Sequence, residues 1–136
     1  MLIQDIMTKR VVTIEMDDKL SVVKDIFDNS KFHHLLVIEE EKLFGVVSDR
    51  DLLKALSPNL GTMTETYKDA ATLQKRVHQI MTRKPITLPA TATVKDAVNL
   101  FNTHRISCIP IVDQDFRPVG IVSWRDIMKR VLDCFK

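Results

Sequence analysis

The sequence has very little glycine. Only three glycines occur in 136 residues, Gly45, Gly61 and Gly120, and they are too far apart to form a glycine-rich phosphate loop. The histidines, serines and carboxylates show no spacing typical of a nucleophile with its base or of a metal centre. We therefore expect no enzymatic activity and no obligatory cofactor or metal.

Cysteines and long apolar segments are also scarce. The two cysteines, Cys108 and Cys134, have no CxxC spacing, and Cys108 lies in an apolar run as a small buried residue would. No stretch is long enough to span a bilayer, and no charged leader precedes an apolar run at Met1. The expected location is the cytoplasm, without membrane association.

Aromatic residues amount to 6% of the chain, and the formal net charge is only +2. Basic pairs at Lys9-Arg10, Lys75-Arg76 and Arg83-Lys84 are most simply read as solvated surface. Nucleic-acid binding needs a basic stripe with interleaved aromatics, which is missing here. The hydrophobic share of 45% and the charged share of 28% are typical of a globular protein instead.

An internal repeat organises the chain. Ile6-Met7-Thr8 recurs as Ile80-Met81-Thr82, and GVVSDRD at 45–51 recurs as GIVSWRD at 120–126. Further matches keep the same order along both halves, which chance does not produce. The predicted division is a first repeat at 1–58, a linker at 59–76 and a second repeat at 77–136.

Each repeat predicts the element order β-α-β-β-α. Helical spacing of apolar residues follows Asp17-Asp18 in the first repeat, and Thr91 and Thr93 in the second, and these residues suit a helix start. Short acidic turns separate the last two strands of each repeat. The expected strands are 11–14, 34–38 and 43–48, then 85–88, 107–112 and 118–123; closing helices pass through Leu52, Leu53 and Leu56, and through Ile127, Met128, Val131, Leu132 and Phe135.

The fold class that follows is α/β. The first two strands of each repeat are joined through a helix and should be parallel, whereas the short turn makes the last two antiparallel. A unit of this size buries too little apolar surface alone, so two should pack with pseudo-twofold symmetry. The linker should cross between them, with a helix over residues 72–81.

The β-α-β-β-α order, the paired GVVSDRD and GIVSWRD motifs and the Ile-Met-Thr openings resemble the CBS domain family. The segment around Ser57-Pro58 and the long linker also resemble stand-alone CBS pairs of the acetoin-utilisation type. The resemblance implies a Bateman module, often a homodimer, with clefts between the repeats. Such clefts bind adenosine-containing ligands, and AMP, ADP, ATP and S-adenosylmethionine are the candidates here.

Ser48 with Asp51, and Ser123 with Asp126, stand where a strand enters a helix. One interpretation is a capping box, in which serine and aspartate satisfy each other's backbone N–H groups. The other is a ligand site, because a helix start suits phosphate and a carboxylate suits two ribose hydroxyls. The resemblance assigns the ribose to the aspartate and the phosphate to the serine, and it shifts the balance toward binding.

Basic residues and histidines extend these two candidate sites. Arg50 and Arg125 either reach a phosphate or remain solvated, and both readings stay open. His33 and His34 lie on opposite strand faces, which disfavours a metal, and are either surface residues or phosphate contacts. The resemblance groups the candidates as cleft 1, with His33, His34, Val46, Ser48, Arg50, Asp51, Arg83, Lys84 and Pro85, and cleft 2, with Lys9, Arg10, Ser107, Ile121, Ser123, Arg125 and Asp126.

Cleft 1 combines histidines, arginine and lysine, and it ranks first. Trp124 distinguishes cleft 2, where it either covers the cleft or packs against a dimer partner. The leading hypothesis is a regulatory module that binds an adenosine ligand and signals to a separate partner protein. The alternative is a ligand-free dimerisation scaffold whose Ser-x-x-Asp boxes only cap helices.

Overall fold

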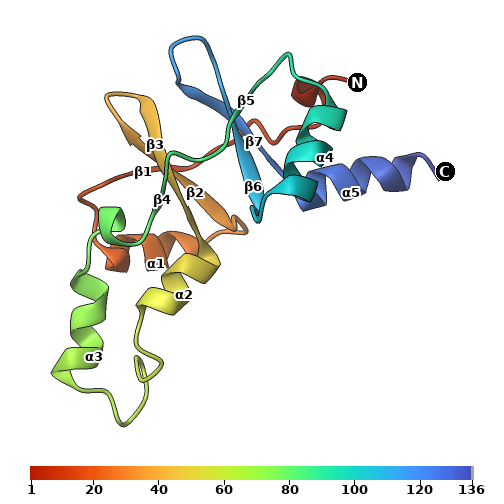
Figure 1. Ribbon diagram of the computed structural model, residues 1–136. Helices are drawn as coiled ribbons and strands as arrows, with labels where there is room; N and C mark the ends of the chain where they lie inside the picture. Colours follow the sequence, from red (N-terminus) through yellow and green to blue (C-terminus); the bar gives the residue numbers. More distant parts are fainter. Residues whose placement is uncertain (136) are drawn as a thin grey trace. The chain divides into compact units, whose positions relative to one another are not determined.

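The computed structural model describes residues 1–135 and divides into two compact units (Figure 1). Unit 1 contains Met1–Val11, Glu40–Leu43 and the chain from Pro85 onward, and unit 2 contains Val12–Glu39 and Phe44–Lys84. Each unit therefore combines most of one repeat with the opening segment of the other. The residue boundaries drawn from the sequence for repeats and linker stay a prediction.

Unit 2 contains a four-stranded sheet in the order β1-β2-β3-β4. β1 runs parallel to β2, with Ile14 opposite Val37, and β3 pairs antiparallel with β4. The apolar residues of α1 and the two central strands form its core, in which Leu20, Leu35 and Val47 are fully buried. The elements are β1 (Thr13–Glu15), α1 (Leu20–Asp28), β2 (His34–Glu39), β3 (Lys42–Ser48), α2 (Asp49–Ala55), α3 (Tyr67–Ala71), η2 (Thr72–Gln74), η3 (Val77–Gln79) and β4 (Thr82–Arg83).

Unit 1 contains a three-stranded sheet in the order β5-β6-β7. β6 lies in the centre, parallel to β5 and antiparallel to β7, and all of its residues are buried. Ala97 and Phe101, one turn apart on α4, pack on this sheet together with Ile127 of α5. The elements are η1 (Ile3–Asp5), β5 (Leu88–Pro89), α4 (Val94–Thr103), β6 (Cys108–Val112), β7 (Pro118–Ser123) and α5 (Trp124–Asp133).

The α/β class and the strand directions are confirmed. Both acidic turns are present: Glu40 and Glu41 form a two-residue connection with positive φ at both positions, as in the hairpin turns that fit strand twist. Cys108 is buried, as expected. Thr93 caps α4 by accepting a hydrogen bond from the Asp96 N–H at 3.1 Å.

The predicted cap of the first helix is wrong. Lys19 is the N-cap of α1 and makes no side-chain capping bond. Asp18 instead accepts the N–H of Glu15 at 2.8 Å, so its carboxylate closes the turn after β1 before the helix begins. Two acidic residues before a helix satisfied the pattern for a cap, but the turn competes for the same side chain.

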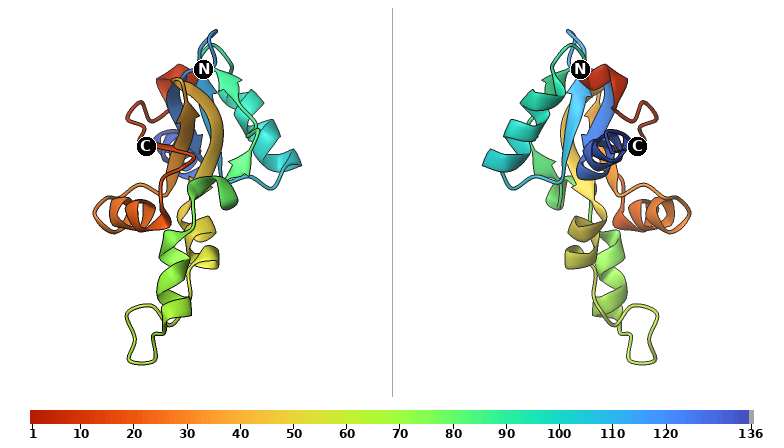
Figure 2. Two further views of the ribbon diagram at one scale, coloured as in Figure 1. Left: turned by 90° about the vertical axis from the view of Figure 1, so that its left-hand side faces the viewer. Right: turned by 90° about the vertical axis from the view of Figure 1, so that its right-hand side faces the viewer.

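The helix expected at 72–81 is also wrong. The linker forms α3 earlier, where Thr66 and Asp69 make a capping box, and then two separate 3-10 turns, η2 and η3, with extended backbone at Lys75. The loop before α3 and α3 itself extend beyond α2, away from the sheet of unit 2 (Figure 2). β1 and β5 begin later than expected, at Thr13 and Leu88.

Candidate functional site

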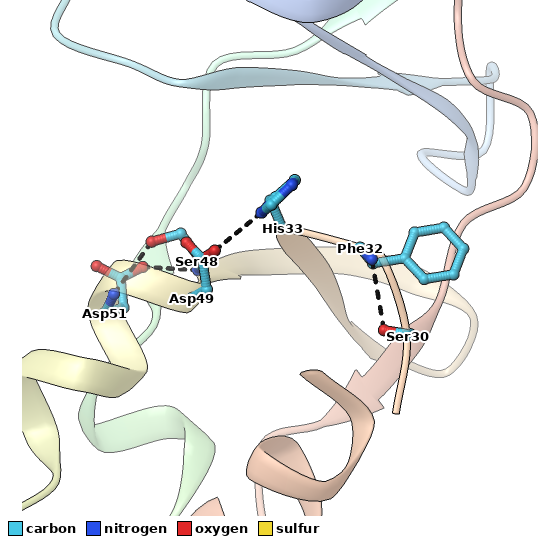
Figure 3. Close-up of polar contacts among 6 residues, drawn as sticks. All are labelled: Ser30, Phe32, His33, Ser48, Asp49 and Asp51. Atoms are coloured by element: carbon cyan, nitrogen blue, oxygen red, sulfur yellow. Dashed lines mark hydrogen bonds and ion pairs between the residues drawn. The ribbon is translucent and has the colours of Figure 1, made fainter. Parts of the chain in front are cut away.

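The junction between β3 and α2 places Ser48 and Asp51 together in unit 2 (Figure 3). Asp51 Oδ2 accepts the N–H of Ser48 at 2.9 Å, and Ser48 Oγ accepts the N–H of Asp51 at 3.1 Å. Both side chains are half-buried. The capping box predicted here is therefore present, but it uses only Oδ2 of the carboxylate.

The backbone N–H groups at the start of α2 are less available than the sequence led us to expect. The Asp49 N–H donates to the carbonyl of His33 at 3.0 Å, and the Asp51 N–H is taken by Ser48. α2 is also only seven residues long, so its dipole is small. An anion at this place would depend on exposed cationic side chains such as Arg50 rather than on the helix itself.

Two histidines lie beside this junction. The exposed His33 points toward α2, and its Nδ1 is 2.9 Å from Asp49 Oδ2 (Figure 3). Burial lowers the pKa of His34 below its ordinary value of 6.5, and His33 lowers it further. The nearby carboxylates of Asp49 and Asp51 raise this pKa, but by less than burial lowers it. Within residues 1–135, no group of three or more potential ligands is arranged to hold a metal ion.

A pH dependence of stability follows from His34. Above pH 6.5 the imidazole is neutral in both states; as the pH falls below 6.5 the unfolded chain takes up a proton that the folded chain resists. We therefore expect the free energy of unfolding to decrease between about pH 7.5 and about pH 5.5. In urea titrations His34→Gln should lose less stability over this interval than the wild type. Equal dependence of stability on pH in the wild type and His34→Gln would contradict the assignment.

The segment after Met81 completes the unit 2 site. β4 pairs antiparallel with β3, so Thr82 lies opposite Val46 and Arg83 opposite Gly45. Arg83 donates a hydrogen bond from Nη2 to the His78 carbonyl at 3.1 Å. The structure thus brings the opening of the second repeat to the strand that leads into Ser48.

Lys84 follows β4 with φ +50°, in the left-handed backbone region that residues other than glycine and asparagine rarely adopt. Strained positions of this kind gather at functional sites. The Lys84 side chain is exposed. Pro85, expected in the same cleft, belongs to unit 1, and its place in the cleft stays a prediction.

Unit 1 holds the equivalent arrangement. Thr8 exchanges two backbone hydrogen bonds of 2.9 Å with Ile121 of β7, just as Thr82 pairs with Val46. Asp126 Oδ2 accepts both the N–H of Ser123 at 2.9 Å and its hydroxyl at 3.2 Å. Oδ1 of the same carboxylate accepts the hydroxyl of Thr8 at 3.1 Å. Both carboxylate oxygens are therefore in use.

The other expected residues of this site are spread around it. Ser107 immediately precedes β6, where Cys108 lies opposite Ser123, so Ser107 lies near the junction. Lys9, Arg10 and Arg125 are exposed. Trp124 packs its ring on Phe101 of the same unit, with ring centroids 4.9 Å apart and planes inclined by 37°, and stays 42% exposed.

Sequence reasoning missed the role of the two threonines and of Asp49. The resemblance placed the segments that begin at Thr8 and Thr82 beside the other repeat's aspartate, but it gave no indication that each threonine pairs with the Gly-apolar-apolar-Ser strand or that the Thr8 hydroxyl bonds Asp126. The glycines of that strand allow the threonine segments to approach so closely. A Cβ on Gly45 would lie 2.8 Å from the Thr82 carbonyl oxygen, and a Cβ on Gly120 would lie 3.1 Å from that of Thr8.

Known proteins share this architecture. A family model described as "CBS domain" matches residues 3–58 and 77–133. A CBS domain-containing protein of Dictyostelium discoideum is 30% identical over 93% of this chain and 88% of its own length. In residues 1–135 no helix combines the length and the apolar character needed to cross a membrane.

Three solved structures are similar along nearly the whole chain. The CBS domain pair of protein MJ0100, crystallised with 5′-methylthioadenosine and S-adenosyl-L-methionine, has a TM-score of 0.80 and 28% identity, covering 100% of this chain and 98% of that one. CBSX2, a CBS-pair protein from Arabidopsis thaliana, crystallised with AMP, has a TM-score of 0.81 and 25% identity, covering 99% and 98%. A proposed acetoin utilization protein from Vibrio cholerae, with a TM-score of 0.79, 21% identity and coverage of 99% and 93%, shows the fold alone.

Proposed function

Because the chain belongs to the CBS domain family and carries two copies of the domain, we propose that it is a regulatory module that binds an adenosine-containing ligand. The observation that carries this proposal is the Asp51 carboxylate, half-buried at a strand-to-helix junction with Oδ1 bonded to no described residue. A carboxylate oxygen of this kind accepts hydrogen bonds from ribose hydroxyls. The relatives crystallised with AMP or S-adenosyl-L-methionine support the ligand class.

The charged groups around Asp51 favour a ligand that carries phosphate or another acidic group. Arg50 and Lys84 are exposed cations in the same unit, and His34 gains positive charge when an anion raises its pKa. AMP, ADP and ATP fit this set best. S-adenosylmethionine offers the same ribose to Asp51, with a carboxylate in place of phosphate.

The ligand would be held by residues from both repeats. Ser48 and Asp51 belong to the first repeat, whereas Thr82 to Lys84 come from the second, and unit 2 contains all of them. Binding at Asp51 would therefore restrain the pairing of β3 with β4. In this proposal the restraint is what a separate partner protein detects, and the chain itself catalyses no reaction.

A dimerisation scaffold is the second candidate, favoured by the complete capping box of Ser48 and Asp51 and by an apolar stripe along α5 and the turn that follows it. Met128, Val131, Leu132 and Phe135 are 40 to 82% exposed and recur at helical spacing. We assign this stripe to a second copy of the chain, since an apolar face of one helix can pair with itself about a twofold axis. The sedimentation coefficient tests it: a homodimer is expected, and a monomer at high concentration contradicts it. Dimerisation and ligand binding are compatible with each other.

The proposed function is tested by calorimetric titration of the purified chain with AMP, ADP, ATP and S-adenosylmethionine. At least one of them should bind saturably and raise the melting temperature, because a ligand that binds only the folded state stabilises it by about 2.7 kcal/mol at one hundred times its dissociation constant. GMP serves as a control for the base. If none of the four ligands at millimolar concentration gives a heat of binding or raises the melting temperature, the dimerisation scaffold becomes the better account.

A further inference from the structure

The two Ser-x-x-Asp sites are built from the same residue types but differ in their hydrogen bonds. In unit 1 the trio is Thr8, Ser123 and Asp126; in unit 2 it is Thr82, Ser48 and Asp51. Both aspartates are half-buried, and each accepts the N–H of its serine through Oδ2 at 2.9 Å. The difference that matters for a ligand is therefore the hydrogen bonding of the second carboxylate oxygen, Oδ1.

Thr8 fills that position in unit 1. Its hydroxyl donates to Asp126 Oδ1 at 3.1 Å, while its backbone is held by two hydrogen bonds to Ile121. Ser123 adds its hydroxyl to the other oxygen at 3.2 Å. Three of the roughly four acceptor positions of a carboxylate are thus occupied by the protein itself.

The corresponding oxygen in unit 2 is open. Asp51 Oδ1 receives no hydrogen bond from residues 1–135, and the exposed hydroxyl of Thr82 is bonded to no side chain of the described part. The same sequence position thus supplies a half-buried threonine that contacts the acid in unit 1 and an exposed threonine that leaves it accessible in unit 2.

The residues beside the aspartates reinforce the difference. Asp49, whose Oδ2 lies 2.9 Å from His33 Nδ1, is replaced at the matching position of the second repeat by Trp124, which packs on Phe101. The strained backbone of Lys84 also has no counterpart, because Arg10 at the equivalent position has no positive φ. The residue that follows the serine is therefore an acid in unit 2 and an aromatic residue in unit 1.

We propose that only one of the two sites takes the ligand: Asp51 receives the ribose hydroxyls through its open Oδ1, whereas Thr8 closes the site at Asp126. This assignment rests on the proposed function and adds to it the stoichiometry. A ribose entering at Asp126 must first displace the Thr8 hydroxyl from a charged acceptor. The lost hydrogen bond weakens binding there by about tenfold or more.

The test is the number of AMP molecules bound per chain, measured by isothermal titration calorimetry on the full-length protein. The wild type should bind one AMP. Thr8→Val keeps the shape of the side chain but removes the hydroxyl, so a second and weaker binding event should appear. Thr82→Val is the matched control at the equivalent position, and it should add no second event. Thr8→Val should also lower the melting temperature, because it alone removes a hydrogen bond within the protein.

The possible outcomes separate this assignment from the proposed function. Two AMP molecules bound to the wild type, or a single event that persists in Thr8→Val, would overturn the assignment and leave the proposed function intact. If Thr8→Val does not fold, two AMP molecules bound to the wild type would still overturn the assignment, and the loss of the single event in Asp51→Asn would support it. No AMP bound to the wild type would count against the proposed adenosine ligand, and the assignment would fall with it.

Discussion

Asp51→Asn should lower the affinity for the adenosine ligand by at least about tenfold while leaving the fold intact. The amide has the size of the carboxylate, and its oxygen can still accept the Ser48 N–H that closes the capping box. What it loses is the negative charge that strengthens hydrogen bonds from the two ribose hydroxyls. Titration calorimetry of wild type and variant measures the ratio of dissociation constants directly.

Asp96→Asn is the matched control for this substitution. Asp96 forms a capping box with Thr93 of the same geometry, with a bond of 2.9 Å from the Thr93 N–H, but it lies outside both candidate sites. The Asp96→Asn variant should therefore bind the ligand as tightly as the wild type does. If Asp51→Asn and Asp96→Asn bind equally well, Asp51 is a cap and nothing more.

Gly45→Ala adds one methyl group beside the site and should lower the free energy of unfolding by about 1 to 3 kcal/mol, as expected for overpacking. Its Cβ would lie 2.8 Å from the backbone oxygen of Thr82 and 2.9 Å from Met81 Sδ. A backbone oxygen cannot rotate away, so β4 must move. That movement displaces Thr82 to Lys84, and ligand affinity should fall together with stability. Urea unfolding and titration calorimetry report the two effects.

Gly120→Ala offers the internal comparison. The closest atom to its Cβ is the sulfur of Met7, at 2.6 Å, which sits at the end of a flexible side chain, while the Thr8 carbonyl oxygen is 3.1 Å away. The side chain can adjust, and the lower entropy of the unfolded alanine chain offsets part of the remaining cost. Gly120→Ala should therefore be destabilised less than Gly45→Ala. The reverse order would show that the close approach of β4 to β3 is not the constraint.

The internal repeat made the order of elements and the strand directions predictable. Apolar runs of strand length locate β2 and β6 because these strands are buried on both faces, and helical spacing of apolar residues locates α4, which buries Ala97 and Phe101. The same spacing locates α5, although only Ile127 of that helix is buried. Ser48 with Asp51 was also predictable, since a capping box is a local feature. Asp18 shows the limit of local reasoning: a turn and a helix start compete for the same carboxylate.

The exchange of opening segments between the two units was predictable only through the family resemblance, which grouped Lys9 and Arg10 with Asp126, and not from local sequence patterns. Thr8 lies 118 positions from Asp126, and the propensities of an Ile-Met-Thr segment do not say which strand it will join. The difference between the two aspartates arises from such long-range contacts. The similar motifs predicted a ranking of the two clefts from nearby side chains, but not that one carboxylate is occupied by a threonine hydroxyl and the other has an open oxygen.

A crystal structure of the chain grown with AMP tests the central claim most directly, through the position of the ribose. The account predicts both ribose hydroxyls within hydrogen-bonding distance of the Asp51 carboxylate, with the Thr8 hydroxyl still on Asp126. A ribose bound at Asp126 instead, or a side chain of the protein lying on Asp51 Oδ1 with no ligand present, would contradict it.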